Sequence, residues 1–214
     1  MDEALVERTA RRLMAEDLFS GWGVRTLSSR RPAFDPFSYH RGSVWPVEQG
    51  AFAIGFWRYG LHAYVEKAAR ALFEAAALFD YYRLPEVFSG HQRDANHPFP
   101  AVYPKANSPQ AWSASATFCL IQAILGIYPY APLNLLFVDP HMPEWLPTIT
   151  VNRLRIGNAM VSLRFFRETD GGSSYEILDK RGSLHVIRQP SPWSLTTGYG
   201  ERVKDVMASF LPGK

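Results

Sequence analysis

The sequence predicts a mainly α protein that is followed by a small antiparallel β-sheet, and two observations lead to this fold class. Up to about residue 128, apolar residues recur every three or four positions, which is the period of a helix with one buried face. After Pro129 the apolar period changes to two, which is typical of strands. We therefore expect a helical part at residues 1–130 and a smaller β-rich part at residues 131–214.

Four helices are expected in the first part, at residues 2–18, 46–59, 61–79 and 108–126. Pro46 suits the first turn of the second helix, because the backbone N–H groups of a first turn have no acceptor within the helix and proline loses nothing by lacking one. Gly60 follows the expected end of that helix. Ser108 and Pro109 open the fourth helix with a capping residue and a first-turn proline.

Short strands are expected at residues 151–156, 160–165, 175–178 and 184–187, where apolar and polar residues alternate. Gly157-Asn158 and Asp170-Gly171-Gly172 are the turn sequences that join strands into hairpins. A terminal helix is expected at residues 199–210.

The composition excludes several classes of function. The formal charge is +3, and the basic residues are scattered instead of forming the stripe that nucleic-acid binding requires. The single cysteine, Cys119, cannot form an internal disulfide, which is typical of a reducing compartment. Residues 1–18 have no apolar core of a signal peptide, and polar residues, glycine and prolines interrupt the apolar stretch 114–138. We expect a soluble, cytoplasmic protein with neither a nucleic-acid nor a membrane partner.

Two long connections, residues 19–44 and 82–108, carry most of the aromatic and polar side chains between the helices. Loops of this length are uncommon unless they are functional. Aromatic rings pack on the apolar faces of sugars, while charged groups bind sugar hydroxyls. The connections therefore suggest a sugar cleft, although packing in the core or between helices is the favoured interpretation of any single tryptophan.

No cofactor or metal ion is expected, because the sequence has no glycine-rich phosphate loop and no HExxH or CxxC motif. His91, Asp94 and His97 could form a weak metal site. Exposed loop histidines or sugar contacts are the favoured interpretation of these residues.

Glu86 follows Leu84-Pro85, so it stands on a restricted backbone just after an expected helix end. Glycoside hydrolysis uses two carboxylic groups, one as an acid and one as a base or nucleophile. A glutamate in a loop is more often a solvated surface residue, and composition alone does not separate the two interpretations.

Four motifs occur in order along the chain: SGWGVRTLS (20–28), SYHRGSVWPVE (38–48), RLPEVFSGH (83–91) and YPKANSPQAW (103–112). In their order and spacing they resemble bacterial amylo-α-1,6-glucosidase-like proteins. These are six-hairpin glycoside hydrolases related to glycogen-debranching enzymes, mannosylglycerate hydrolases, glucoamylases and trehalases. The resemblance covers nearly the whole chain and implies a role in carbohydrate metabolism.

The resemblance implies an (α/α)6 toroid, of which this chain would form an incomplete part, the C-terminal helical hairpins. It also implies that Glu86 is the general base of an inverting reaction. Val47 and Glu48 stand where many relatives have histidine and aspartate. The residues expected to contact the sugar are Trp22, Arg25, Tyr39, His40, Arg41, Trp45, Glu48, Gln110 and Trp112.

The general acid of the family is an aspartate in a motif upstream of all four, and no carboxylate here stands in a similar motif. We therefore expect a glycosidase fragment that is inactive alone, with a missing N-terminal half or a second copy of the chain as partner. Its ligand would be a glucosyl unit or a short oligosaccharide, joined by an α-1,6, an α-1,4 or a small-glycoside bond. The alternatives are a non-catalytic carbohydrate-binding module and an inactive remnant.

Overall fold

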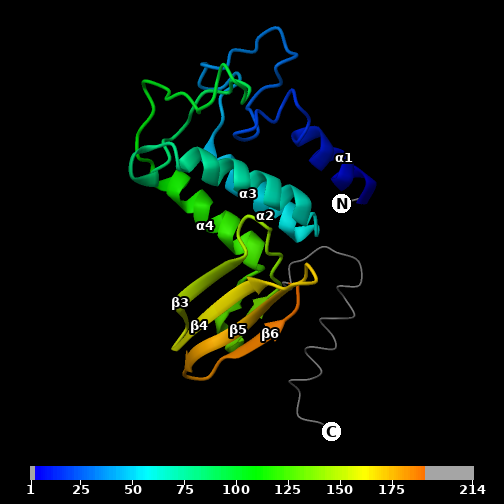
Figure 1. Ribbon diagram of the computed structural model, residues 1–214, viewed down its shortest axis with the longest axis vertical. Coiled ribbons are helices and arrows are strands. Elements are labelled where there is room, and N and C mark those ends of the chain that lie inside the picture. Colours follow the sequence, from blue (N-terminus) through cyan, green and yellow to red (C-terminus); the bar gives the residue numbers. More distant parts are fainter. Residues whose placement is uncertain (1–2, 191–214) are drawn as a thin grey trace. The chain divides into compact units, whose positions relative to one another are not determined.

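The computed structural model describes residues 3–190, and Figure 1 shows the order of their helices and strands. The contacts divide the chain into two compact units. The first unit holds the described parts of Met1–Phe56 and Ala63–Ile121, and the second holds Trp57–His62 and the described part of Gln122–Lys214. The domain boundary that we expect at residue 130 stays a prediction. The expected terminal helix at residues 199–210 lies outside the described residues.

The four predicted helices are all present: α1 (Glu3–Leu13), α2 (Pro46–Arg58), α3 (His62–Ala76) and α4 (Ala111–Leu125). The expected start of the fourth helix at Ser108 and Pro109 is wrong, because α4 begins only at Ala111. Within the first unit, Gly50 of α2 lies against Ala116 of α4. Leu72 of α3 and Leu120 of α4 are fully buried. No helix in the described part of the chain is long and apolar enough to cross a membrane.

Helix α1 ends at Leu13 and not at Leu18 as expected. The chain leaves the helix in tight turns, with the N–H groups of Leu18 and Phe19 both bonded to the carbonyl of Ala15. Arg12 then donates two hydrogen bonds to the buried carboxylate of Asp17. This ion pair fixes the exit of the helix, a tertiary feature that apolar spacing does not report.

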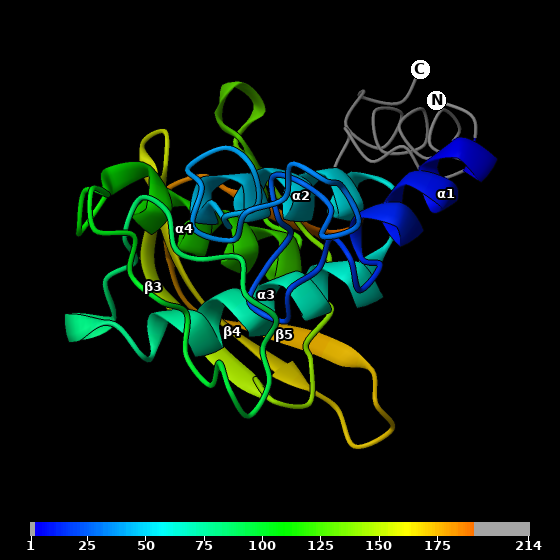
Figure 2. The same ribbon diagram turned by 90° about the horizontal axis from the view of Figure 1, so that it is seen from above.

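Apart from Tyr82, which ends the short 3-10 helix η1 (Asp80–Tyr82), the two long connections are not helical, and they lie side by side (Figure 2). Isolated β-bridges join Arg25 to Val44, Val44 to Phe88 and Phe88 to Val102. Val44 and Phe88 exchange both backbone hydrogen bonds, at 3.0 and 3.1 Å, and both side chains are fully buried. This short ladder holds the motifs of the two connections next to each other.

A close backbone contact also joins the two connections. A Cβ atom placed on Gly90 would lie 1.7 Å from the carbonyl oxygen of Gly42. Because real Cβ atoms never approach an oxygen so closely, position 90 accepts only glycine without a backbone shift.

The second unit contains six strands: β1 (Tyr128–Tyr130), β2 (Leu135–Val138), β3 (Thr148–Ile156), β4 (Ala159–Arg167), β5 (Ser173–Arg181) and β6 (His185–Arg188). They form two three-stranded sheets, in the orders β1-β2-β6 and β3-β4-β5. The second sheet is antiparallel throughout, and its turns lie where Gly157-Asn158 and Asp170-Gly171-Gly172 predicted them. All four side chains of β2 are buried, as are Leu163 and Phe165 of β4.

Two predictions about the fold class are wrong. A single antiparallel sheet was expected, but β6 pairs in parallel with β2 and not with the hairpin strands that precede it. The described residues are about 32% helical and about 24% strand, with four helices in that part of the chain, so the fold is neither mainly α nor a six-hairpin toroid. The physical reason is that all four helices are shorter than expected and that the β-rich part adds strands β1 and β2.

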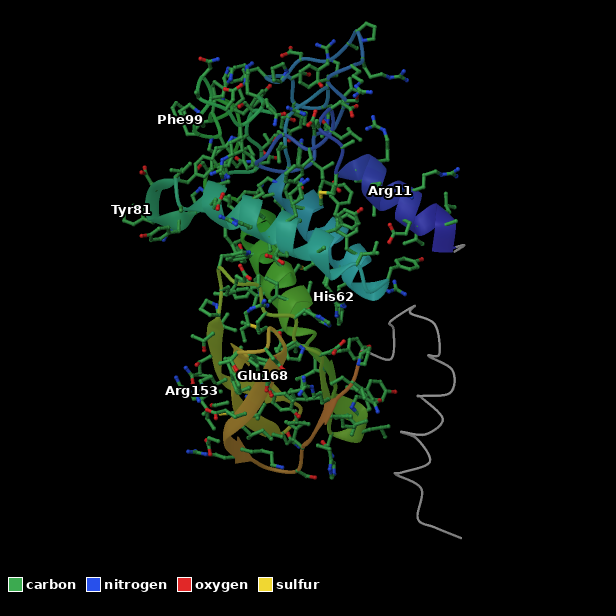
Figure 3. All side chains as sticks on the ribbon, turned by 45° about the vertical axis from the view of Figure 1, so that its right-hand side comes forward. Arg11, His62, Tyr81, Phe99, Arg153 and Glu168 are labelled. Atoms are coloured by element: carbon green, nitrogen blue, oxygen red, sulfur yellow. The ribbon has the colours of Figure 1, made fainter. Side chains whose placement is uncertain are left out.

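Several large apolar side chains are exposed in the first unit. Tyr81 and Phe99 project outward (Figure 3), with 85% and 60% of their surface exposed. On α4, Phe118 is 72% exposed.

Candidate active site around Glu86

The segment that carries Glu86 is tied by its backbone to the fourth motif. The N–H of Glu86 donates to the carbonyl of Asn107 at 2.8 Å, and the N–H of Gln110 donates to the carbonyl of Leu84 at 3.2 Å. Leu84-Pro85-Glu86 and Asn107–Gln110 therefore brace each other. The restricted backbone before Glu86 and the start of α4 come together in this way.

The carboxylate of Glu86 accepts three hydrogen bonds. The hydroxyl of Tyr39 donates to Oε1 at 2.7 Å, while the backbone N–H and the Nδ2 of Asn107 donate to Oε2 at 3.2 and 3.3 Å. Glu86 is 6% exposed, so it is not the solvated surface residue of the alternative interpretation. The hydrogen bond to Glu86, together with burial, raises the pKa of Tyr39, which keeps this hydroxyl protonated and donating.

Tyr39 is positioned by its own motif. Its carbonyl oxygen accepts hydrogen bonds from the Ser43 hydroxyl at 2.8 Å and from the indole N–H of Trp45 at 2.9 Å. Trp45 directly precedes Pro46, the first residue of α2. The start of this helix therefore fixes the tryptophan, which in turn fixes the tyrosine that contacts Glu86.

Aromatic side chains surround this arrangement and form a cluster of Tyr39, His40, Trp45, Tyr103 and Trp112. The rings of His40 and Trp45 are parallel, with centroids 5.7 Å apart. Trp45 and Trp112 lie 6.1 Å apart, and Trp112 is 44% exposed. Tyr39 joins this cluster to the carboxylate of Glu86, and exposed aromatic rings such as that of Trp112 offer apolar faces for a ligand.

A pocket of about 430 Å³ opens beside the aromatic cluster. Four of the predicted sugar-contacting residues line it: Arg25, His40, Trp45 and Glu48. Glu48 lies in the first turn of α2, where the helix dipole favours a negative charge. Glu86 does not line this pocket. His40 and Trp45 belong to both the pocket lining and the aromatic cluster.

The structure does not bring Arg41 to Glu86. The Arg41 side chain is exposed, and its Nε donates to the Ser38 hydroxyl at 3.2 Å. Gln110 accepts the N–H of Ala111 with its side-chain oxygen at 2.9 Å, at the start of α4. The polar partners of Glu86 are instead Tyr39 and Asn107.

The predicted sugar contacts Trp22 and Arg25 are buried, although Arg25 also lines the pocket. Trp22 is 1% exposed and has the guanidinium of Arg93 4.1 Å above its ring. Arg25 donates to the carbonyls of Gly90 and Glu16 and to the side chain of Gln92, and burial lowers its pKa. Packing and loop bracing account for both side chains, and their assignment to sugar contact stays a prediction.

The sequence interpretation missed Asn107, although it stands inside the quoted motif YPKANSPQAW. An asparagine in a loop gives no periodic signal, and its partner Glu86 is 21 positions away. His91 and His97 stack at 4.5 Å, and His97 pairs with Asp94 at 3.1 Å. They are not among the groups of the described residues whose ligand atoms could hold a metal ion.

Residues 1–91 match the family model of the mannosylglycerate hydrolase MGH1-like glycoside hydrolase domain. This stretch includes Glu86, Tyr39 and Trp45 and ends before Asn107 and Trp112. The match supports a glycoside hydrolase family for this part of the chain, and a domain of that family implies carbohydrate as its ligand. A search of the curated proteins finds no match.

Proposed function

We propose that this chain is part of an inverting, amylo-α-1,6-glucosidase-like glycoside hydrolase in which Glu86 is the general base and the aromatic cluster binds a glucosyl unit. The observation that carries the proposal is the buried carboxylate of Glu86, which Tyr39 and Asn107 orient, together with the contact between the rings of Tyr39 and Trp45. The match of residues 1–91 to a glycoside hydrolase domain supports the reaction class.

In the proposed reaction, a water molecule attacks the anomeric carbon as Glu86 takes its proton. The bond from that carbon to the leaving oxygen breaks, and a general acid protonates the leaving oxygen. Inversion requires the two carboxylic groups to stand about 6.5–9.5 Å apart. The hydroxyl of Tyr39 donates a hydrogen bond to one oxygen of Glu86. This hydrogen bond fixes the orientation of the carboxylate, and so the direction in which its lone pairs accept the proton of the water.

The general acid is assigned to a polypeptide segment outside this sequence, because no carboxylate of the chain stands in a motif like that of the family's acid. Protonation of the leaving group contributes about 10²–10⁴-fold, so the chain alone is expected to leave ordinary glycosides uncleaved.

A substrate whose leaving group needs no proton tests the base separately from the acid. In α-glucosyl fluoride the C–F bond breaks to release fluoride, while water adds its hydroxyl to the anomeric carbon and gives its proton to Glu86. We expect the 214-residue chain to hydrolyse this compound slowly and to release β-glucose, measured by a fluoride electrode and by NMR. Glu86→Gln should lower the rate about 100-fold or more.

The matched control is Glu144→Gln, which changes an exposed glutamate of the second unit. It should keep the wild-type rate. Release of α-glucose would contradict inversion, and an unchanged rate in Glu86→Gln would contradict the role of Glu86.

A non-catalytic carbohydrate-binding role is the second candidate, because the same three hydrogen bonds make Glu86 a brace between the two connections. Calorimetry with maltose and isomaltose separates the two. Sugar binding without any fluoride release, retained in Glu86→Gln, favours the binding module. If the chain shows neither sugar binding nor fluoride release, both candidate functions are contradicted.

A further inference from the structure

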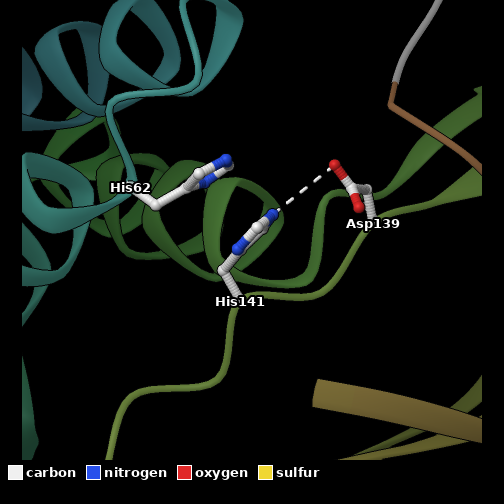
Figure 4. Close-up of side chains that lie close together, drawn as sticks. All are labelled: His62, Asp139 and His141. Atoms are coloured by element: carbon white, nitrogen blue, oxygen red, sulfur yellow. Dashed lines mark ion pairs between the residues drawn. The ribbon is translucent and has the colours of Figure 1, made fainter. Parts of the chain in front are cut away.

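Three metal-ligating side chains meet in the second unit: His62, Asp139 and His141 (Figure 4). Among the residues that the structure describes, these three form the one group of histidine and carboxylate side chains that lie close enough together to bind a metal ion. Each offers one ligand atom, and all three atoms lie within 4.8 Å of one another. The sequence interpretation expected no metal site and did not single out any of them.

The backbone around the three residues is fixed. His62 is the first residue of α3, and Asp139-Pro140-His141 directly follows the buried strand β2. The N–H of His141 donates to the carbonyl of Ile124 at 2.8 Å. A Cβ atom on Gly126 would lie 2.2 Å from the Asp139 carbonyl oxygen, so a glycine is required for this close approach.

The side chains leave ligand atoms available. Nδ1 of His62 is buried and has no hydrogen-bond partner. The rings of His62 and His141 stack with centroids 3.3 Å apart, and Nε2 of His141 lies 3.5 Å from a carboxylate oxygen of Asp139. A buried nitrogen without a partner is uncommon in folded proteins, and a bound ion would satisfy it.

We propose that His62, Asp139 and His141 bind one divalent transition-metal ion of the Zn²⁺ class. Two imidazoles and one carboxylate are the borderline donor set that Zn²⁺ and its neighbours prefer, whereas Mg²⁺ and Ca²⁺ require oxygen ligands. Three protein ligands leave a fourth position for water. The proposal is independent of the glycosidase reaction, since none of the three residues takes part in it.

Binding requires a small rearrangement. Ligand atoms around a tetrahedral zinc ion stand about 3.4 Å apart, so the three atoms must close in and the stacked rings must turn apart. The side chain of His141 is 41% exposed, which leaves room for its ring to rotate. Burial, followed by the neighbouring His141, lowers the pKa of His62 to about 4, and a neutral imidazole is the form that ligates metal.

The test uses the full 214-residue chain without an affinity tag, freed of metal by a chelator and then titrated with Zn²⁺ against a chelating dye. We expect one Zn²⁺ per chain. His141→Gln and Asp139→Asn should each weaken binding about tenfold or more, because each removes a direct ligand. At the same Zn²⁺ concentration, the Tm should rise by several degrees in the wild type and by less in His141→Gln.

Matched controls are His97→Gln in the exposed loop and Cys119→Ser at the single cysteine. Both should bind Zn²⁺ like the wild type. His141 is exposed, so its variant should fold, which circular dichroism checks. With Co²⁺, visible absorption bands of a low-coordinate site should appear in the wild type and disappear in His141→Gln. The absence of a saturable site, or equal affinity in His141→Gln, would overturn the proposal.

Discussion

The hydroxyl of Tyr39 donates a 2.7 Å hydrogen bond to Glu86, linking the second motif of the chain to the third. The two residues stand in different long connections, which the ladder of Val44 and Phe88 holds together. Glu86 is thereby fixed by residues that are distant in the sequence. The orientation of the proposed base depends on the loops as much as on its own segment.

Tyr39→Phe removes this donor while keeping the ring. We expect the rate of α-glucosyl fluoride hydrolysis to fall about ten- to a hundredfold at nearly constant KM, because a displaced base loses its alignment with the water. The free energy of unfolding should fall by about 1–3 kcal/mol. Tyr82→Phe, at an exposed tyrosine, is the control and should change neither quantity. A Tyr39→Phe rate equal to that of the wild type would argue against an orienting role.

Trp112→Ala tests the aromatic cluster. The ring is 44% exposed and borders Trp45, so its loss should remove about 1 kcal/mol of sugar contact and weaken maltose or isomaltose binding about five- to tenfold. Trp22→Ala is the comparison at a buried ring, where we expect a loss of about 3–5 kcal/mol of stability. Calorimetry and urea unfolding measure the two effects. A Trp22→Ala protein that keeps its stability but loses sugar binding would contradict the packing role of Trp22 and make it a sugar contact.

Gly90→Ala should destabilise the first unit by about 3 kcal/mol or more, because the added methyl group meets the backbone of Gly42. Gly55→Ala is the matched control inside α2. A Cβ atom there meets nothing within 4 Å, so alanine should raise the free energy of unfolding by about 0.5–1 kcal/mol through helix propensity. Urea unfolding of both variants gives the answer. If Gly90→Ala and Gly55→Ala have the same free energy of unfolding, the backbone at Gly42 can shift at little cost to accept a side chain at position 90.

The stability of the first unit should depend on pH through Asp17. Hydrogen bonds from Arg12 and then Ser28 hold the pKa of this buried carboxyl well below its usual range. Its contribution is therefore complete at a pH well above the unfolded pKa of about 3.9, and it is lost progressively as the pH falls from about 5 toward the folded pKa.

Urea midpoints measured from pH 6 to pH 3 test this dependence. Asp17→Asn should be less stable than the wild type at pH 6 and should lose less stability on acidification. Asp80→Asn, at an exposed aspartate, should keep the wild-type slope. An equal slope in Asp17→Asn would mean that other carboxyls govern the acid transition.

The four helices could be predicted because their signals are local. The proline at the start of α2 and the spacing of apolar residues in α3 act within a few turns of the chain. The exit of α1 could not be predicted, because it depends on the pairing of Arg12 with Asp17. The alternation at residues 184–187 identified a strand, but alternation does not specify a partner or a direction, so the parallel pairing of β6 with β2 was missed.

The same distinction applies to the two sites. Glu86 and Tyr39 stand in recognisable motifs, so a resemblance could single them out in advance, and the structure adds the hydrogen bond between them. Asn107 is brought to Glu86 by the loops. His62 and His141 come from the start of a helix and the end of a strand, and only the fold makes them neighbours.

The parallel pairing of β2 with β6 has a consequence for the nascent chain. β2 is synthesised before both hairpins of the β3-β4-β5 sheet, yet one of its two partners is made after them. Until residue 188 has left the ribosome, Leu135, Leu136, Phe137 and Val138 present one strand edge without its native partner. Such an apolar edge is a template for wrong pairing between chains. Folding during translation should therefore depend on how fast the ribosome adds the segment from β3 to β6, and a pause there should increase aggregation.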